Sequence, residues 1–341
     1  MSAARYAENA KIKEMVKKRT KLQINMTDSR EDLDRFPTRE DLCRLLDGFD
    51  GIELMHLEKE TSGILTPDMV VGYHTVFPEY WMDFRRGDQE AYRKEFDTPE
   101  KAFHYYGGNT PEALIRKIRT EYENAVSFGA EYAVIHVSDA GIFEEITGKY
   151  KYTDAEVIGE FSELVNEALE GLDGPWLLLE NLWQPGLTFC DPDITARLME
   201  SITYPKKGIM LDTGHLMHTE PSLRTQKEAV SYIHRRLDEH GSLCRCIKGV
   251  HLHQSVTGAA MRHFKKSPPV PAATYEERLG QLFDYVFRVD LHRPFTAEGV
   301  TELIERIDPD YLTFELISRN LEEHEQMLKR QRSALKKGTV I

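Results

Sequence analysis

The sequence predicts an α/β protein, a single (β/α)8 TIM barrel with long loops on the C-terminal face of the barrel. Short apolar runs rich in β-branched residues recur along the chain, and amphipathic stretches with helical spacing separate them. Strands that alternate with helices are typical of parallel βαβ units. Eight such runs are present, and eight parallel strands close a barrel. The length of 341 residues suits one barrel with insertions.

The predicted strands share an apolar body and a polar final residue in most cases. In chain order they are Leu22–Met26, Gly51–Met55, Met69–His74, Tyr132–His136, Trp176–Glu180, Gly208–Asp212, Gly249–His253 and Tyr311–Glu315. The predicted helices are Thr38–Leu46, Pro111–Phe128, Thr153–Leu169, Thr225–His240, Thr274–Phe287, Thr296–Ile307 and Leu321–Leu335.

We expect residues 1–341 to form one domain with insertions over the active-site face. The insertions are residues 75–110 and 254–289, and a shorter segment follows the fourth strand at 137–152. Loops after barrel strands lie where TIM-barrel active sites are built, and long loops are often functional. Residues 1–20 predict an N-terminal helix that either covers the bottom of the barrel or joins a homo-oligomer.

Composition and charge restrict the class of protein. Hydrophobic residues make up 40% and charged residues 30% of the chain, and no apolar run is long enough to span a membrane. The N-terminus lacks the apolar centre of a signal peptide, so we expect a cytoplasmic protein. The four cysteines form no CxxC pair. The formal net charge of −13 disfavours a nucleic-acid partner without excluding one.

Histidine and acidic residues end six of the eight predicted strands. The strand-end residues are His74, His136, Glu180, Asp212, the pair His251 and His253, and Glu315, and His215 follows the sixth strand closely. A carboxylate at the end of a buried strand is costly unless it is paired or binds a cation. Imidazoles together with carboxylates suit divalent ions such as zinc, manganese, magnesium or cobalt. The sequence therefore predicts a divalent-metal centre at the barrel mouth.

Short motifs in a fixed order carry a resemblance to a known superfamily. The motifs are LLLENL at Glu180, IMLDTGH at Asp212 and His215, GVHLHQS at His251 and His253, and LTFEL at Glu315. With this order over residues 21–320 the chain resembles the xylose-isomerase-like barrels, which unite sugar isomerases and epimerases with apurinic-site endonucleases.

The isomerase and epimerase branch implies one divalent ion. Its ligands would be Glu180, Asp212, either His251 or His253, and Glu315. The resemblance implies that Glu180 and Glu315 act as base and acid on opposite faces of a sugar-like substrate. His215 would contact a substrate oxygen.

The endonuclease branch implies three zinc ions instead. Its ligands would be His74, His136, Glu180, Asp212, His215, His251, Glu315 and an Asp-x-His pair, which Asp290 and His292 would supply. The residues from Gln254 to Val289 separate this pair from the seventh strand by far more than the family uses, so one to three ions remain open.

The sequence favours a metal-dependent isomerase or epimerase of a small sugar or polyol, with the endonuclease-like phosphodiester hydrolase as the alternative. Long loops around the mouth would crowd an incoming duplex. We expect His253, Trp81 and Arg262 to contact the substrate. The basic segment RHFKKS at 262–267 suits a sugar phosphate and a phosphodiester equally.

Overall fold

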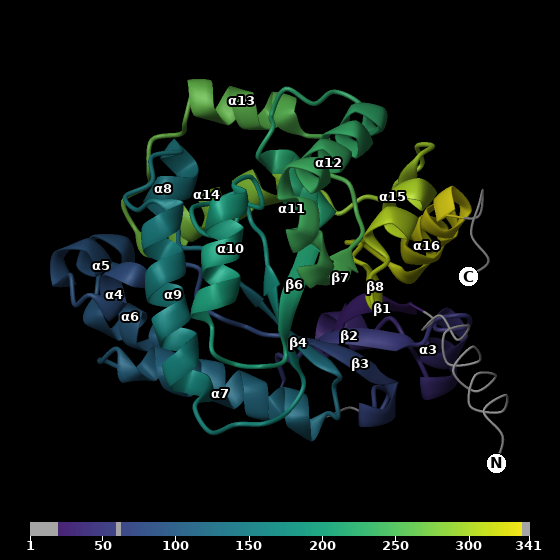
Figure 1. The fold of residues 1–341 in the computed structure, drawn as a ribbon. Helices are drawn as coiled ribbons and strands as arrows, with labels where there is room; N and C mark the ends of the chain where they lie inside the picture. Colours follow the sequence, from purple (N-terminus) through teal and green to yellow (C-terminus); the bar gives the residue numbers. More distant parts are fainter. Residues whose placement is uncertain (1–19, 59–62, 336–341) are drawn as a thin grey trace, which may run out of the picture.

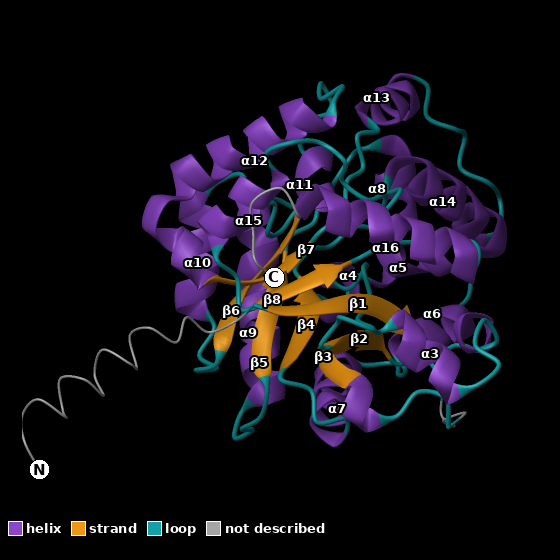
Figure 2. Ribbon diagram, turned by 90° about the vertical axis from the view of Figure 1, so that its right-hand side faces the viewer, coloured by secondary structure: helices purple, strands orange, loops and turns teal. Residues whose placement is uncertain are grey.

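Eight parallel strands form a closed barrel in which each strand pairs with the next and β8 pairs with β1. The computed structural model describes residues 20–58 and 63–335. The strands are β1 (Lys21–Thr27), β2 (Gly51–Met55), β3 (Val70–His74), β4 (Tyr132–His136), β5 (Trp176–Glu180), β6 (Lys207–Asp212), β7 (Ile247–His251) and β8 (Tyr311–Phe314). The predicted (β/α)8 barrel is confirmed, and Figures 1 and 2 show the strands at its centre among the helices.

In the described residues an α-helix follows every strand except β2, which only a 3-10 turn at Pro67–Met69 separates from β3. The helices are α2 (Arg30–Leu33), α3 (Arg39–Leu45), α4 (Met82–Arg85), α5 (Gln89–Phe96), α6 (Pro99–Tyr106), α7 (Glu112–Ser127), α8 (Ile142–Thr147), α9 (Asp154–Leu169), α10 (Pro192–Ser201), α11 (Thr213–His218), α12 (Gln226–His240), α13 (Gly258–Lys266), α14 (Tyr275–Val289), α15 (Val300–Ile307) and α16 (Leu321–Leu335). Two 3-10 turns, η1 (Pro67–Met69) and η2 (Gly241–Cys246), precede β3 and β7.

Threonine caps fix where several of these helices begin. Thr38, Thr153, Thr225 and Thr274 each accept a hydrogen bond from the third residue of the helix, whose acidic side chain bonds back to the threonine backbone. This capping box satisfies backbone N–H groups that the helix cannot pair itself. These four starts agree with the predicted helices to within one residue.

The segments predicted as insertions contain helices of their own. Residues 75–110 hold α4, α5 and α6, residues 137–152 hold α8, and residues 254–289 hold α13 and α14. The sequence analysis also gave no helix between β5 and β6, where α10 lies. The first turn of α10 contains Pro192, and Asp191 caps it, which is a start signal for a helix.

Strand β7 ends at His251 and not at the predicted His253. The N–H of Leu252 still donates to Thr313 of β8 (2.8 Å), but the N–H of His253 donates to the Thr213 hydroxyl (3.2 Å). The Thr213 side chain of α11 therefore accepts the N–H that a longer strand would use for pairing with its neighbour, and β7 ends before His253.

The barrel interior changes from apolar to polar towards the strand ends. An apolar layer that includes Val134, Leu178 and Met210 lies within the barrel. Glu53 lies fully inside the barrel, where it accepts hydrogen bonds from Tyr132 (2.5 Å) and Thr313 (3.1 Å). Glu53, Tyr132 and Thr313 therefore supply polar partners directly beneath the strand ends.

The N-terminal helix expected over residues 1–20 lies outside the described residues, which begin at residue 20. Among the helices of the described ranges, none combines the length and the apolar character that a membrane crossing needs.

Replacing Gly72 by alanine is expected to destabilise the barrel. Gly72 of β3 pairs with Tyr132 of β4, and a Cβ atom at Gly72 would overlap the Tyr132 ring. Overpacking of this kind costs about 1–3 kcal/mol. Denaturant-induced unfolding measures the loss. Gly159→Ala in α9, where no atom lies within 4 Å of the added Cβ, serves as the control. Equal stability of the two variants would contradict this packing.

Candidate metal centre

Neighbouring strands bring the predicted ligands to one level of the barrel. His136 of β4 is in register with Glu180 of β5, and Asp212 of β6 is in register with His251 of β7. The side chains of Glu180, Asp212 and His251 are fully buried. Residues far apart in the sequence therefore meet at the carboxyl ends of the strands. We call this cluster of side chains the metal centre.

In the described residues, four groups of side chains, three of which share members, each have ligand atoms within 4.8 Å of one another. The groups are His74, His136 and Glu180; Glu180, Asp212, His251 and Glu315; His215, His253, Asp290 and His292; and Glu53, His74 and His251. All nine residues that the sequence offered as ligands fall within the first three groups.

Glu180 joins the first two groups through its two carboxylate oxygens. Its Oε2 lies 3.2 Å from Nε2 of His74 and 3.4 Å from Nε2 of His136. Its Oε1 lies 3.1 Å from Nδ1 of His251 and 3.3 Å from Nδ1 of His215. A carboxylate with one oxygen directed to each of two ligand groups is placed to bridge two cations.

Asp212 joins the second group to the third through a single oxygen. Its Oδ2 lies 3.7 Å from Nδ1 of His251 and 2.8 Å from Nε2 of His253. Its Oδ1 accepts the backbone N–H of His215 (2.6 Å), because Asp212 also caps α11. The cap fixes the carboxylate and places His215 one turn away on the same side of the centre.

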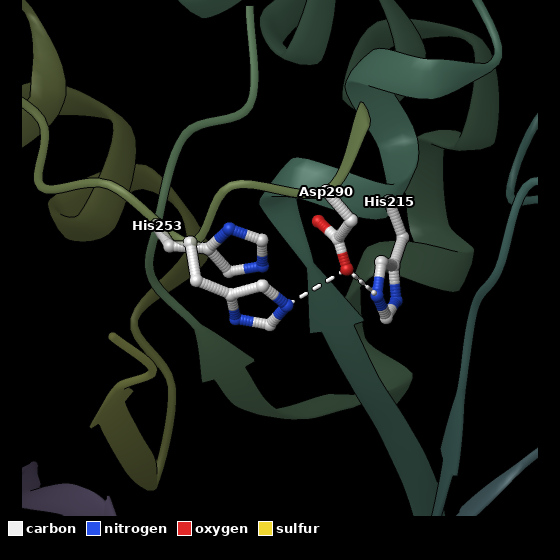
Figure 3. A group of neighbouring side chains, drawn as sticks. His215, His253 and Asp290 are labelled. Atoms are coloured by element: carbon white, nitrogen blue, oxygen red, sulfur yellow. Dashed lines mark hydrogen bonds and ion pairs between the residues drawn. The ribbon is translucent and has the colours of Figure 1, made fainter. Parts of the chain in front are cut away.

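The third group confirms that the Asp-x-His pair reaches the centre. Oδ2 of Asp290 lies 2.7 Å from Nε2 of His292 and 3.4 Å from Nε2 of His215. Figure 3 shows the Asp290 carboxylate between His215 and His253. The His253 and His292 rings stack with centroids 3.9 Å apart. His253 is thus part of the centre together with His251, although β7 itself ends at His251.

A short backbone clamp explains how the pair reaches the centre across a long insertion. Gln254 and Arg293 form an antiparallel bridge, with N–H to O distances of 2.7 and 3.1 Å. Ser255 donates its hydroxyl to Asp290 (3.1 Å) and accepts the N–H of Leu291 (2.9 Å). The segment that holds α13 and α14 therefore leaves and rejoins the barrel at one place.

Outer hydrogen bonds fix the histidines of the first group and His215. Nδ1–H of His74 donates to the Thr75 carbonyl (3.2 Å), and Nδ1–H of His136 donates to Glu79 (2.6 Å). Nδ1 of His215 lies 3.0 Å from the Asn181 carbonyl. In each ring the other nitrogen then faces a carboxylate of the centre.

His251 and His292 also have outer partners. Nε2 of His251 lies 2.9 Å from Oε1 of Glu53 in an ion-pair contact that lacks hydrogen-bond geometry, and its Nδ1 faces Glu180 and Glu315. Nδ1 of His292 lies 3.3 Å from the Glu315 carbonyl. An outer partner that fixes the tautomer and the ring orientation is a regular feature of metal-binding histidines.

The carboxylates concentrate negative charge at the centre. Burial alone would raise the pKa of Glu180, but the charges of His251 and His136 hold that pKa well below its usual range. Burial opposes charge on His136 too, yet Glu79 and Glu180 raise its pKa to about 10. The buried carboxylates therefore favour positive charge at this place. Either protons on the imidazoles or bound divalent cations would supply that charge.

The donor set fits divalent cations. Within the described residues the carboxylates of Glu180, Asp212, Asp290 and Glu315 contact imidazoles and pair with no lysine or arginine. Nitrogen and carboxylate donors without thiolates suit zinc, manganese and related ions. Buried carboxylates of this density are costly without such a partner.

A cavity of about 350 Å³ opens on the metal centre, and we call it the reaction cavity. Its centre wall consists of His74, His136, His215, Asp290, His292 and Glu315. Its far wall includes Asn25, Arg35, Ser318 and His324, with Phe36 and Leu316 among the apolar residues. Arg35 donates to the Ser318 carbonyl (3.1 Å) and pairs with Asp32 (3.1 Å), so its charge is already partnered.

None of the three expected substrate contacts lines the reaction cavity, because His253 is fully buried in the third ligand group and the other two lie elsewhere. Trp81 is fully buried, donates its indole N–H to the Ser138 carbonyl (2.8 Å) and packs against Phe161, so it belongs to the core. Arg262 on α13 donates to the Pro221 carbonyl and lines a different cavity. Aromatic and basic composition suggested both contacts, but helix packing decides where such side chains point.

The sequence analysis missed the outer partners of the histidines, chiefly Glu53 and Glu79. Glu53 left a signal, because it is a charged residue in the middle of the otherwise apolar run GIELM. Glu79 left none, since it lies in the loop after β3 without a distinguishing pattern.

The variant Glu53→Gln is expected to weaken metal binding about 10–100-fold. The neutral amide polarises His251 less than the carboxylate does and disturbs its orientation. Competition with a chelator of known affinity measures the change. Glu131→Gln, at an exposed ion pair with Lys21, is the control. Equal affinities of the two variants would show that Glu53 does not position His251.

Removing the Asp-x-His pair is expected to lower the metal content of the protein by one ion per chain. The double variant Asp290→Asn with His292→Gln deletes two donors of the third group and leaves the other three groups complete. Elemental analysis of the purified proteins gives the count. Asp284→Asn, at an exposed pair with Arg288, should change nothing. An unchanged count in the double variant would exclude the third site.

Comparisons with known proteins agree with this architecture. The model of the xylose isomerase-like TIM barrel family matches residues 102–337, which is more than half of the chain. Endonuclease IV from Thermus thermophilus is similar in structure, with a TM-score of 0.51 and 13% identity over 93% of this chain and 100% of that one. D-allulose 3-epimerase from Methylomonas sp. has a TM-score of 0.52 and 13% identity, covering 94% of this chain and 98% of that one. No curated protein sequence matches the chain. The chain belongs to the xylose isomerase-like TIM barrel family.

Proposed function

We propose that the protein is a metal-dependent hydrolase that cleaves a phosphate ester with a cluster of up to three divalent ions. The single observation that supports the proposal is that Asp290 and His292 lie beside His215 in the cluster of candidate metal ligands. A one-ion enzyme needs only Glu180, Asp212, His251 and Glu315. The further histidines and Asp290 would then have no ligand role.

The first ligand group would hold one ion, the second group another, and His215, Asp290 and His292 a third. Bound divalent ions would supply Lewis acidity to phosphoryl oxygens and to the attacking water. Sites with neighbouring ions suit in-line displacement at phosphorus, where charge develops on both the attacking and the leaving oxygen.

The side chains of the chain orient this chemistry. Glu180 and Asp212 keep the ligand groups adjacent, and the outer bonds of the histidines keep the lone pairs directed inward. The reaction cavity of about 350 Å³ limits the space beside the centre to a small group. Together with the net charge of −13, this favours a small phosphate ester over duplex DNA as substrate.

Turnover of a chromogenic ester tests the proposal. With zinc or manganese added, the protein is expected to release 4-nitrophenol from 4-nitrophenyl phosphate or from bis(4-nitrophenyl) phosphate. The double variant Asp290→Asn with His292→Gln should lose about 100-fold or more in kcat/KM, because one ion fewer stabilises the transition state. Asp284→Asn is again the control. Turnover that survives in the double variant, or no turnover of either ester, would refute the hydrolase.

A sugar isomerase or epimerase is the second candidate, because the second ligand group alone forms a complete one-ion site. Glu180 and Glu315 both lie 3.1 Å from Nδ1 of His251, so two carboxylates flank one ligand position. This function requires exchange of a substrate C–H with deuterated water, observed by NMR, that Glu315→Gln abolishes and the Asp290 and His292 variants spare.

A further inference from the structure

A second cavity of about 330 Å³ lies beside the metal centre and shares none of its lining residues with the reaction cavity. Residues of α8, α11, α13 and α14 contribute to its walls. Figure 1 shows α13 at the top of the view, with α8, α11 and α14 below it. We call it the aromatic cavity. The proposed hydrolase makes no use of it.

Aromatic side chains form much of its lining. They are Tyr150, Trp183, Phe264 and Tyr285. Phe264 and Tyr285 contact each other edge to face with centroids 5.0 Å apart, and Trp183 contacts His218 at 4.5 Å. Rings from several elements around one space favour a flat aromatic occupant, which stacks on such faces.

Two hydrogen-bond acceptors also line the aromatic cavity. Nε2–H of His218 donates to the Val289 carbonyl (3.0 Å), so Nδ1 is an acceptor, and it is buried without a hydrogen bond in the described structure. His218 itself is only 2% exposed. Glu145 is buried as well, and its Oε1 lies at 3.4 Å from the Tyr150 hydroxyl. These acceptors match a ring that carries N–H groups.

Two cations of α13 line the same cavity at its exposed side. Arg262 and Lys265 are both exposed, and they come from the basic segment 262–267, which the sequence suggested for contact with a phosphate group. Arg262 donates to the Pro221 carbonyl, whereas Lys265 forms no ion pair with any residue of 20–58 or 63–335. In a chain of net charge −13, this local positive charge suits an anionic group.

We propose that the aromatic cavity is a second binding site, for a nitrogen heterocycle that carries an anionic group, as a nucleotide does. The ring lies among the aromatic side chains, its N–H groups donate to His218 and Glu145, and its anionic group meets Lys265 and Arg262. Trp183 and His218 separate this bound heterocycle from the metal centre. On their other side, both rings contact His215 of the third group.

Calorimetric titration of the metal-loaded protein with adenosine monophosphate tests the site. Adenosine monophosphate is expected to bind about tenfold more tightly than adenosine, which lacks the anion, and than ribose 5-phosphate, which lacks the ring. Base stacking on aromatic side chains and the attraction between phosphate and cation each supply a part of this difference.

Paired variants locate the binding. Lys265→Glu and Phe264→Ala should each weaken adenosine monophosphate binding about tenfold, since the first reverses a charge of the lining and the second removes a ring. The controls are Lys266→Glu on the same helix and Phe283→Ala on α14, both exposed and outside the cavity. They should stay within about twofold of the unmodified protein, as surface changes usually do.

Three results would overturn the proposal. One is no measurable binding of adenosine monophosphate. Another is equal binding of adenosine monophosphate and ribose 5-phosphate, which would indicate phosphate bound at the metal centre. The third is an affinity that neither Lys265→Glu nor Phe264→Ala changes. Because both variants lie outside the metal centre, these results are independent of whether the protein hydrolyses phosphate esters.

Discussion

Each histidine of the first two groups has a polar partner on the nitrogen that faces away from the centre, which is a hydrogen bond for His74 and His136 and an ion-pair contact for His251. Once Thr75, Glu79 or Glu53 occupies the outer nitrogen, only the inner nitrogen is left to face Glu180. The orientation is built into the fold, because the partners belong to strand β2 or to loops that directly follow β3. A cation therefore meets donors that need little rearrangement, which is how outer partners raise metal affinity.

The strand ends were predictable from the sequence because a buried parallel strand is a continuous apolar run, and a polar residue that ends such a run stands out. Glu180 and Asp212 follow this rule, and the barrel then brings them together. Asp290 and His292 were a harder case, since nothing local distinguishes a ligand pair from an ordinary charged loop. Contacts between distant residues place them, namely the backbone bridge between Gln254 and Arg293 and the hydrogen bonds of Ser255.

Side chains in the inserted segments were the least predictable. Trp81 was expected at the mouth because it lies in a long loop, but α4 forms there and packs its N-terminal residue against α9. Composition indicates that a segment is rich in aromatic residues, and tertiary packing decides whether they face the core or a ligand. The same limit applies to Arg262, which lines the aromatic cavity and not the reaction cavity.

The bridge between Gln254 and Arg293 has a consequence for how this barrel can vary. Because the two ends of the intervening stretch are fastened to each other, α13 and α14 form a closed excursion, and Asp290 caps the end of α14 where the chain returns to the barrel. Extending a loop with fixed ends costs little free energy. The excursion is therefore a natural point for exchanging one accessory module for another, so that relatives can acquire new recognition surfaces while the metal ligands stay in place.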